Sequence, residues 1–363
     1  MMVSREIDKN MVVSDIIGED DVVFYDVRRQ PFDLYGLYDP CNQPQFKRLP
    51  DNIGRNVNEG IARLYLNTAG GRVRFATDSQ YVAIRAKIQI PNKYPHMSMF
   101  GVAGFDLYLD DSDTGDSRYY ETFKIGADVT DEYSYKIKFK SRRMRYLTVN
   151  FPSYSNVSSL LIGLQGDAVL DHGLRYRDVP PVVYYGSSIT QGACASRPGN
   201  AYPNVVCRKT NTDFINLGFA GSGLAEESIA HYMASLKMSV FVADYDHNAP
   251  NPAYLQPSAE RLYRIIRETQ PTLPYVFMTK PDFNISRYDE NLLRRDVIYE
   301  IYQQARREGD QNVYFIDGSS LFRCDEGDMA TVDRTHPNDY GFYRMAKAVE
   351  SELRWIWRSD LVR

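Results

Sequence analysis

The residues with the clearest chemical potential lie where an apolar run breaks into small residues. Val182–Tyr185 is rich in β-forming residues, and Gly186, Ser187 and Ser188 follow it, with Gly192 closing the stretch. A strand that ends in this way brings a small hydroxyl residue to the carboxyl edge of a sheet, where open α/β sheets bind ligands. Serine and glycine also fill ordinary turns, so the stretch alone leaves both interpretations open.

A base and a carboxylate that could activate such a serine occur together near the C-terminus. Asp333 precedes His336 by three residues, and a helix-like run from Asn338 to Arg358 follows. A serine nucleophile needs a base to take its proton, and the base needs a carboxylate to hold its tautomer. Because one turn of chain can fold Asp333 back onto the imidazole, the sequence predicts acyl transfer by a serine of the first block.

These blocks resemble the nucleophile and closing blocks of the SGNH/GDSL hydrolase superfamily. The stretch 186–192 is similar to the Gly-Asp-Ser-Leu block, with Ser187 in place of the usual Asp and Ser188 at the nucleophile position. Asp333 and His336 match the closing Asp-x-x-His-Pro block. The resemblance covers residues 180–358 and implies a catalytic triad of Ser188, Asp333 and His336.

Two further blocks of the resemblance lie between these. Asn216–Gly221 looks like the second block, whose glycine, here Gly221, donates its backbone N–H to the oxyanion. Asp246, His247 and Asn248 stand where the third block usually reads Gly-x-Asn-Asp. The resemblance therefore implies an oxyanion hole made of the Ser188 and Gly221 backbone N–H groups and the Asn248 side-chain amide.

Two nearby residues are candidates for substrate binding. Arg197 follows the nucleophile loop and offers bidentate recognition of a substrate oxygen, but it could equally form an ion pair that holds the loop. His247 could line the pocket beside Asn248 or only pack there. Of the other histidines, we expect His96 and His172 to be surface or packing residues, and His231 to be solvated on a helix.

The sequence predicts no metal and no cofactor. Asp244 and Asp246 end a predicted strand, but no third carboxylate or histidine cluster accompanies them. The four cysteines show no paired metal spacing and no disulfide-scaffold density, and they are Cys41, Cys194, Cys207 and Cys324. We expect Cys194, although close to the nucleophile loop, to be a small buried thiol.

Size and composition indicate a two-domain globular protein. The 363-residue chain is longer than one core usually supports, and its 43% hydrophobic and 25% charged residues are an ordinary globular balance. A net charge of −4 without a basic stripe argues against a nucleic-acid partner. No apolar stretch approaches the roughly 18 residues of a membrane span. Because residues 1–10 have no apolar run, we expect a cytoplasmic protein, unless a leader was removed. Oligomeric state does not follow from the sequence.

The first half has the pattern of an antiparallel β-sandwich, jelly-roll-like domain over residues 1–175. Residues 1–20 are polar and read as a strap or a frayed end. Short β-type runs separated by turn residues follow, with no convincing amphipathic helix. These runs are Ile61–Leu66, Val73–Phe75, Tyr81–Ile88, Gly104–Leu109, Tyr135–Phe139, Met144–Asn150 and Leu160–Leu164.

One of these strands carries a second resemblance. Gly104–Tyr108 is similar to the Gly-x-Asp-Leu-Tyr signature of the β domain that precedes one group of SGNH esterases. Its Asp106 either accepts hydrogen bonds from backbone donors or faces the domain junction.

The second half, residues 180–363, is predicted to be a flavodoxin-like SGNH hydrolase domain. After a linker over Asp171–Pro181, five strand-like runs alternate with five helix-like runs, which is the pattern of a parallel sheet covered on both faces. One predicted helix, Pro257–Thr269, has a proline in its first turn. Ser188, Gly221 and Asn248 each follow a strand, so we expect them at the same edge of the sheet.

The resemblance implies a serine esterase for short-chain, especially acetyl, esters, with a saccharide ester as the favoured substrate. Two alternatives remain open at this point. One is an acyltransferase of the same fold, which passes the acyl group to a hydroxyl acceptor. The other is a carbohydrate-binding protein with a disabled site, against which the intact Ser188, Asp333 and His336 argue.

Overall fold

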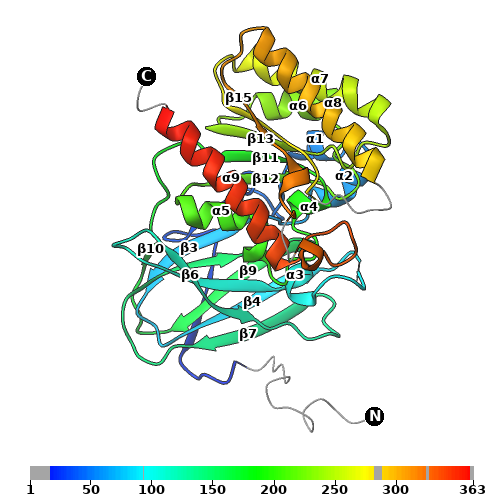
Figure 1. Cartoon of the computed structure of the whole chain (residues 1–363). Helices are drawn as coiled ribbons and strands as arrows, with labels where there is room; N and C mark the ends of the chain where they lie inside the picture. Colours follow the sequence, from blue (N-terminus) through cyan, green and yellow to red (C-terminus); the bar gives the residue numbers. More distant parts are fainter. Residues whose placement is uncertain (1–16, 93, 282–287, 324–326, 360–363) are drawn as a thin grey trace.

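The computed structural model describes residues 17–359 except 93, 282–287 and 324–326. The expected strap over residues 1–20 therefore lies almost wholly outside the described residues, as does Cys324. Two antiparallel sheets form the lower body in Figure 1, and a parallel sheet with its helices lies above them. The fold class predicted from the sequence is confirmed.

The antiparallel sheets face each other across one apolar core. The first has the order β1-β9-β4-β7, and the second has the order β10-β3-β8-β5-β6, with β2 paired to β3. Strand β4 shows why they pack: Val82, Ile84 and Ala86 are buried at alternate positions. The strands are β1 (Val22–Asp26), β2 (Asp33–Tyr35), β3 (Arg72–Thr77), β4 (Tyr81–Gln89), β5 (Phe105–Asp110), β6 (Ser117–Phe123), β7 (Glu132–Lys138), β8 (Arg145–Asn150), β9 (Asn156–Gln165) and β10 (Leu170–His172).

The third sheet is parallel, with the order β12-β11-β13-β14-β15. Its first two strands in the chain, β11 and β12, lie side by side, and the order then reverses direction, so a crevice forms at the carboxyl end of β11. The strands are β11 (Val182–Gly186), β12 (Phe214–Gly218), β13 (Val240–Asp244), β14 (Tyr275–Met278) and β15 (Val313–Ile316).

Alternate side chains of this sheet bury against different helices. Val183 and Tyr185 pack with the helices of one face, α6, α7 and α8, whereas Val182 and Tyr184 pack with α5 and α9 on the other. Figure 1 shows α9 (red) lying along the sheet beside α5. The α-helices that follow β11 are α4 (Ser188–Gln191), α5 (Tyr202–Thr210), α6 (Glu227–Ala234), α7 (Pro252–Thr269), α8 (Tyr288–Arg307) and α9 (Asp339–Ser359). Short 3-10 turns are η3 (Pro198–Asn200), η5 (Gly318–Ser320) and η6 (Gly327–Ala330).

Three local predictions are wrong. The run Ile61–Leu66 is not a strand, because Asn58 caps helix α2 (Glu59–Leu64) by accepting from the Ile61 N–H at 2.8 Å. Helix α7 begins at Pro252, five residues before the predicted start, after an Asn251 cap, and Pro257 lies inside it. The linker starts later than Asp171, because β10 pairs with β3.

The segment between β2 and β3 crosses the boundary that the sequence suggests between the halves. It forms α1 (Asp51–Gly54) and α2, which lie beside the parallel sheet in Figure 1; a further short helix, α3 (Met99–Ala103), precedes β5. Leu49, Ile61 and Tyr65 share one buried cluster with residues of β11 and β12. The two halves are thus joined by apolar packing of this segment as well as by the chain.

Candidate active site

The nucleophile candidate Ser188 lies at the first turn of a helix that begins directly after β11. Ser187 caps this helix, α4, because its hydroxyl accepts from the Ile189 N–H at 3.1 Å. Gly186 is required at the strand end: a Cβ there would lie 2.0 Å from Thr190 Oγ1. The turn therefore directs the Ser188 side chain away from the strand and toward the crevice at its carboxyl end.

The structure brings Ser188, His336 and Asp333 together. Ser188 Oγ lies 2.9 Å from His336 Nε2, and His336 Nδ1 lies 2.8 Å from Asp333 Oδ2. Asp333 Oδ1 also accepts from the His336 backbone N–H at 2.8 Å, so the carboxylate holds both the ring and the loop that carries it. Arg334 adopts φ +66°, which lets the chain turn back within these few residues.

Asp333 stays ionised in this arrangement. Partial burial alone would raise its pKa, but hydrogen bonds from the backbone and side chain of His336 outweigh burial and hold the pKa of Asp333 below its usual value. A carboxylate beside Nδ1 favours the tautomer with a proton on Nδ1, which leaves Nε2 free to accept the Ser188 proton.

Gly221 lines the same crevice. It lies at the tip of the loop after β12 with φ +63°, a conformation that suits glycine, and nothing lies within 4 Å of where a Cβ would be. Within the described part of the chain, the Gly221 N–H has no hydrogen-bond acceptor. The second backbone donor is the N–H of Ser188, which lies at the first position of α4, where a backbone N–H has no partner within the helix.

Asn248 reaches this loop, but its amide is already engaged. Its Nδ2 donates to Phe219 O at 2.9 Å and, more weakly, to Gly223 O at 3.3 Å. Both partners are carbonyl oxygens, so the nitrogen must be the atom that faces them. Asn248 therefore braces the loop that carries Gly221, and only its weaker hydrogen bond could be redirected to a substrate oxyanion.

A hollow of about 410 Å³ opens beside Ser188. One wall comes from the parallel-sheet half and includes Gly221, His247, Asn248 and His336. The other wall comes from the N-terminal half and consists of Tyr94, His96, Met97 and Tyr154. Of these, Tyr154 also supports the nucleophile helix, since its hydroxyl donates to Ser188 O at 3.2 Å.

Sequence reasoning missed this N-terminal wall. His96, expected as a surface or packing residue, is exposed but lies at the hollow, and its ring centroid is 5.5 Å from that of His336. No periodicity marks Tyr94, His96 and Met97, because they come from the connection between β4 and α3. A cluster of Tyr94, His96 and Met97 in a long loop was the only available signal.

The two substrate-binding candidates lie in different places. His247 lines the hollow. Arg197 does not: it lies at the junction of the halves, with Nε 3.6 Å from Asp106 Oδ2 and its guanidinium 3.8 Å from the Tyr119 ring centroid. Of its two interpretations, the structure matches the ion pair. His172 and His231 have half-exposed side chains and lie near Asp33 and Glu227.

Asp106 fulfils both possibilities that the sequence left open: it accepts a backbone hydrogen bond, and it lies at the junction of the halves. Its carboxylate is fully buried and accepts from the Gly199 backbone N–H at 2.8 Å and from Asn150 Nδ2 at 2.7 Å. Burial raises the pKa of Asp106, and these hydrogen bonds and the nearby Arg197 partly offset that effect. The Gly-x-Asp-Leu-Tyr strand thus holds η3, the turn that follows the nucleophile helix.

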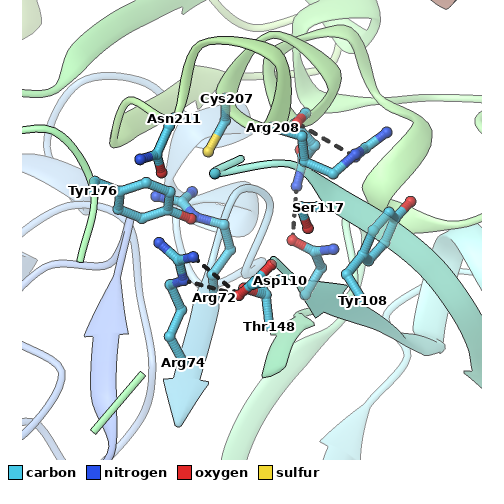
Figure 2. Close-up of a pocket in the computed structure, with 13 residues that line it drawn as sticks. Arg72, Arg74, Tyr108, Asp110, Ser117, Thr148, Tyr176, Cys207, Arg208 and Asn211 are labelled. Carbon is cyan, nitrogen blue, oxygen red and sulfur yellow. Dashed lines mark hydrogen bonds and ion pairs between the residues drawn. The ribbon is translucent and has the colours of Figure 1, made fainter. Parts of the chain in front are cut away.

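A second polar hollow lies deeper in the same junction and is shown in Figure 2. Arg74 pairs there with Asp110 at 2.9 Å, and Thr148 donates to the same carboxylate oxygen at 2.6 Å. About 10 Å³ is open, which is room for one water molecule rather than for a substrate. This hollow is a structural feature of the interface.

Among the described residues, one group has metal-ligand geometry: donor atoms of His96, Cys194 and His336 lie within 4.8 Å of one another. Both ring nitrogens of His336 are, however, engaged by Ser188 and Asp333. Burial, together with Asp333, raises the pKa of the Cys194 thiol to about 12, so it is a neutral buried group as expected. This arrangement fits a serine–histidine pair better than a metal centre.

The two aspartates at the end of β13 are buried and engaged by protein groups. Asp244 Oδ2 accepts from Thr190 Oγ1 at 2.9 Å, and Asp246 Oδ2 accepts from the Lys280 backbone N–H at 3.1 Å. Burial raises the pKa of Asp246 to about 6.

In the part of the chain that the structure describes, no helix is long and apolar enough to cross a membrane.

Comparisons with known families match both halves. Residues 22–170 match the model of the N-terminus of SGNH-hydrolase-type esterases, named for its GxDLY motif. Residues 180–354 match the GDSL-like lipase/acylhydrolase family. No curated protein matches the chain.

Solved structures with the same fold cover nearly the whole chain. A putative GDSL-like lipase from Bacteroides ovatus is 26% identical, with 93% of this chain and 98% of that chain covered and a TM-score of 0.83. A salicylyl-acyltransferase from a tetracycline biosynthetic pathway is 18% identical, with the same coverage and a TM-score of 0.75. An acetyl xylan esterase from the rumen bacterium Butyrivibrio proteoclasticus is 12% identical, with 92% and 98% covered and a TM-score of 0.57.

Proposed function

Because the chain belongs to the SGNH/GDSL-type esterases, with a GxDLY domain before the hydrolase domain, we propose that it removes short acyl groups, above all acetyl, from saccharide hydroxyls. The observation that carries the proposal is the alignment of Ser188, His336 and Asp333, joined at 2.9 and 2.8 Å beside an open hollow. A serine, a base and an orienting carboxylate in this geometry are the components of acyl transfer through a covalent serine ester.

The chemistry proceeds in two halves. His336 Nε2 takes the Ser188 proton while Oγ attacks the ester carbonyl, and Asp333 stabilises the imidazolium that forms. The backbone N–H groups of Ser188 and Gly221 receive the negative charge that develops on the carbonyl oxygen. The tetrahedral intermediate expels the alcohol, which takes the proton from His336. Water, activated by the same histidine, then attacks the acyl-serine and releases the acid, and His336 returns the proton to Ser188 Oγ.

The walls of the hollow support a saccharide ester. Tyr94, Tyr154, His96 and His247 each combine an apolar ring with a polar group, which suits a ligand with both C–H faces and hydroxyl groups. Among proteins that share the fold, the acetyl xylan esterase acts on such a ligand, as its name states.

A second candidate uses the same covalent intermediate and replaces water by an alcohol. The volume of about 410 Å³ beside Ser188 leaves room for such an acceptor, and the salicylyl-acyltransferase shares the fold. An acyltransferase would transfer acetyl to an added sugar faster than to water, so the ratio of acetylated sugar to free acetate separates the two functions.

The test is acetate release from a panel of acetylated mono- and oligosaccharides beside an aryl acetate. Ser188→Ala should abolish release, and Asp333→Ala and His336→Ala should be severely impaired. The matched control is Ser187→Ala, which removes the neighbouring hydroxyl and the α4 cap but should keep most of the activity. Release that is strongest on one sugar would support the proposal. A dead Ser187→Ala with an active Ser188→Ala would overturn the assignment of the nucleophile.

A further inference from the structure

Residues from both halves hold the loop that carries Gly221, and two of them, Arg48 and Asn58, come from the N-terminal half. Arg48 is the first of these: its Nη1 donates to Gly218 O at 2.5 Å and to Asn216 O at 3.2 Å, at the end of β12. Its guanidinium also lies over the Phe219 ring, 4.4 Å from the ring centroid. One side chain thus fixes the strand end and the first residue of the loop.

Arg48 is an unusual anchor because it is a buried cation without an acidic partner among the described residues. It is 1% exposed, and its other donors bind Asn67 O and Leu64 O, both at 2.8 Å. Burial lowers the pKa of Arg48 to about 9. Burying a cation is costly, so a chain that keeps one surrounded only by carbonyl dipoles gains accurate placement of those carbonyls rather than net stability.

Two amides complete the set of contacts. Gln191 Oε1 accepts from the Ala220 N–H at 3.0 Å, and its Nε2 donates to Asn67 Oδ1 and Ser153 O in the N-terminal half. Asn58 Nδ2 donates to Ser222 O at 3.0 Å and to Glu226 Oε1 at 2.5 Å. The residues on both sides of Gly221 are therefore held, and the Ser222 hydroxyl donates at 3.0 Å to Ala220 O, which belongs to the same peptide unit as the Gly221 N–H.

We propose that Arg48 and Asn58 of the N-terminal half and Gln191 of α4 are positioning residues that set the direction of the Gly221 N–H, so that both halves contribute to the oxyanion hole. The inference rests on the proposed function, because it requires Gly221 to stabilise an oxyanion. A donor helps catalysis only if it is aligned before charge develops, and a misplacement of about 1 Å can cost ~100-fold in rate. Loss of an anchor should therefore weaken transition-state binding and leave ground-state binding unchanged.

The test uses Asn58→Ser in the full chain. Serine keeps the α2 cap, because its hydroxyl can accept from the Ile61 N–H, but it cannot donate to Ser222 O as the amide does. We expect kcat on an aryl acetate to fall about tenfold with KM unchanged. Affinity for a small boronic acid, which becomes tetrahedral on Ser188, should fall in parallel. Arg48→Lys, which keeps the charge but loses the planar fork, should have a larger effect.

The matched control is Asn56→Ser, in the same segment, whose amide donates to Asn52 O within its own turn. Asn56→Ser should leave kcat and the affinity for the boronic acid unchanged. Unchanged kcat and boronate affinity in Asn58→Ser, or an equal loss in Asn56→Ser, would overturn the inference while leaving the proposed function intact. If the wild-type protein neither cleaves esters nor binds the boronic acid, the proposed function fails, and this inference fails with it.

Discussion

Ser187 occupies the position that usually holds Asp in the nucleophile block, and its environment explains why a serine serves there. Its hydroxyl caps α4, and Asp and Ser are both strong N-cap residues. The substitution therefore preserves the local fold that places Ser188, although it removes a charge. The feature that the two residue types share at this position is a side-chain oxygen that can accept from the Ile189 N–H.

Asn248 allows a prediction about the contribution of its side-chain amide to turnover. Asn248→Ala should lower kcat by about 100-fold with little change in KM, because the loop that holds Gly221 loses its contacts to Phe219 O and Gly223 O. Asn248→Asp should be worse than alanine, since it places a carboxylate against two carbonyl oxygens and near the developing negative charge. Steady-state kinetics on an aryl acetate measure both. Equal activity of the two variants would mean that the charge near the oxyanion is irrelevant.

At the scale of elements, Asp106 connects β5 to η3 and should contribute to stability more than to chemistry. Asp106→Asn can keep one of the two hydrogen bonds, to Gly199 N or to Asn150 Nδ2, and leaves a buried amide N–H facing another donor. We expect the free energy of unfolding to fall by about 1–3 kcal/mol. Chemical denaturation checks this, with the exposed loop residue Asp113→Asn as control. A loss below that of the control would show that the junction tolerates the change.

The parallel-sheet half could be predicted well from sequence because its local and global signals agree. Apolar runs, turn residues and helix periods all indicated the five strands and the helices that cover them. The failures occurred where a local signal was ambiguous. Ile61–Leu66 is short and apolar, and only the Asn58 cap and Glu59 in the first turn distinguish it as a helix. Pro257 suggested a helix start, yet α7 accommodates it internally.

The candidate site also contains residues that could be predicted from the sequence and residues that could not. Ser188, Asp333, His336 and Gly221 belong to motifs that sequence resemblance identifies, and the structure brings them to one edge of the sheet. The N-terminal wall could not be predicted, because the contact between His96 and His336 joins residues far apart in the chain. Such contacts follow from how two sheets pack, which no local pattern records.

For the whole molecule, the shared core predicts cooperative unfolding. Leu49, Ile61 and Tyr65 bury against the parallel-sheet half, and Ala193 and Cys194 bury in the core of the β-sandwich. Neither half can unfold without exposing apolar surface of the other. Differential scanning calorimetry should therefore show a single transition, with calorimetric and van't Hoff enthalpies in agreement. Two separated transitions would indicate that the halves are energetically independent.

The exchange of segments also limits how this pair of domains can change partners. Each half carries side chains that pack into the core of the other, and these side chains lie outside the linker that joins the halves. A recombination event at the linker would join two intact sequences and yet leave Arg48 without the carbonyls of β12. Such a protein would contain the nucleophile Ser188 but would lack the contacts of Arg48 with the end of β12. The two halves are therefore expected to pass through evolution as one heritable unit rather than as interchangeable modules.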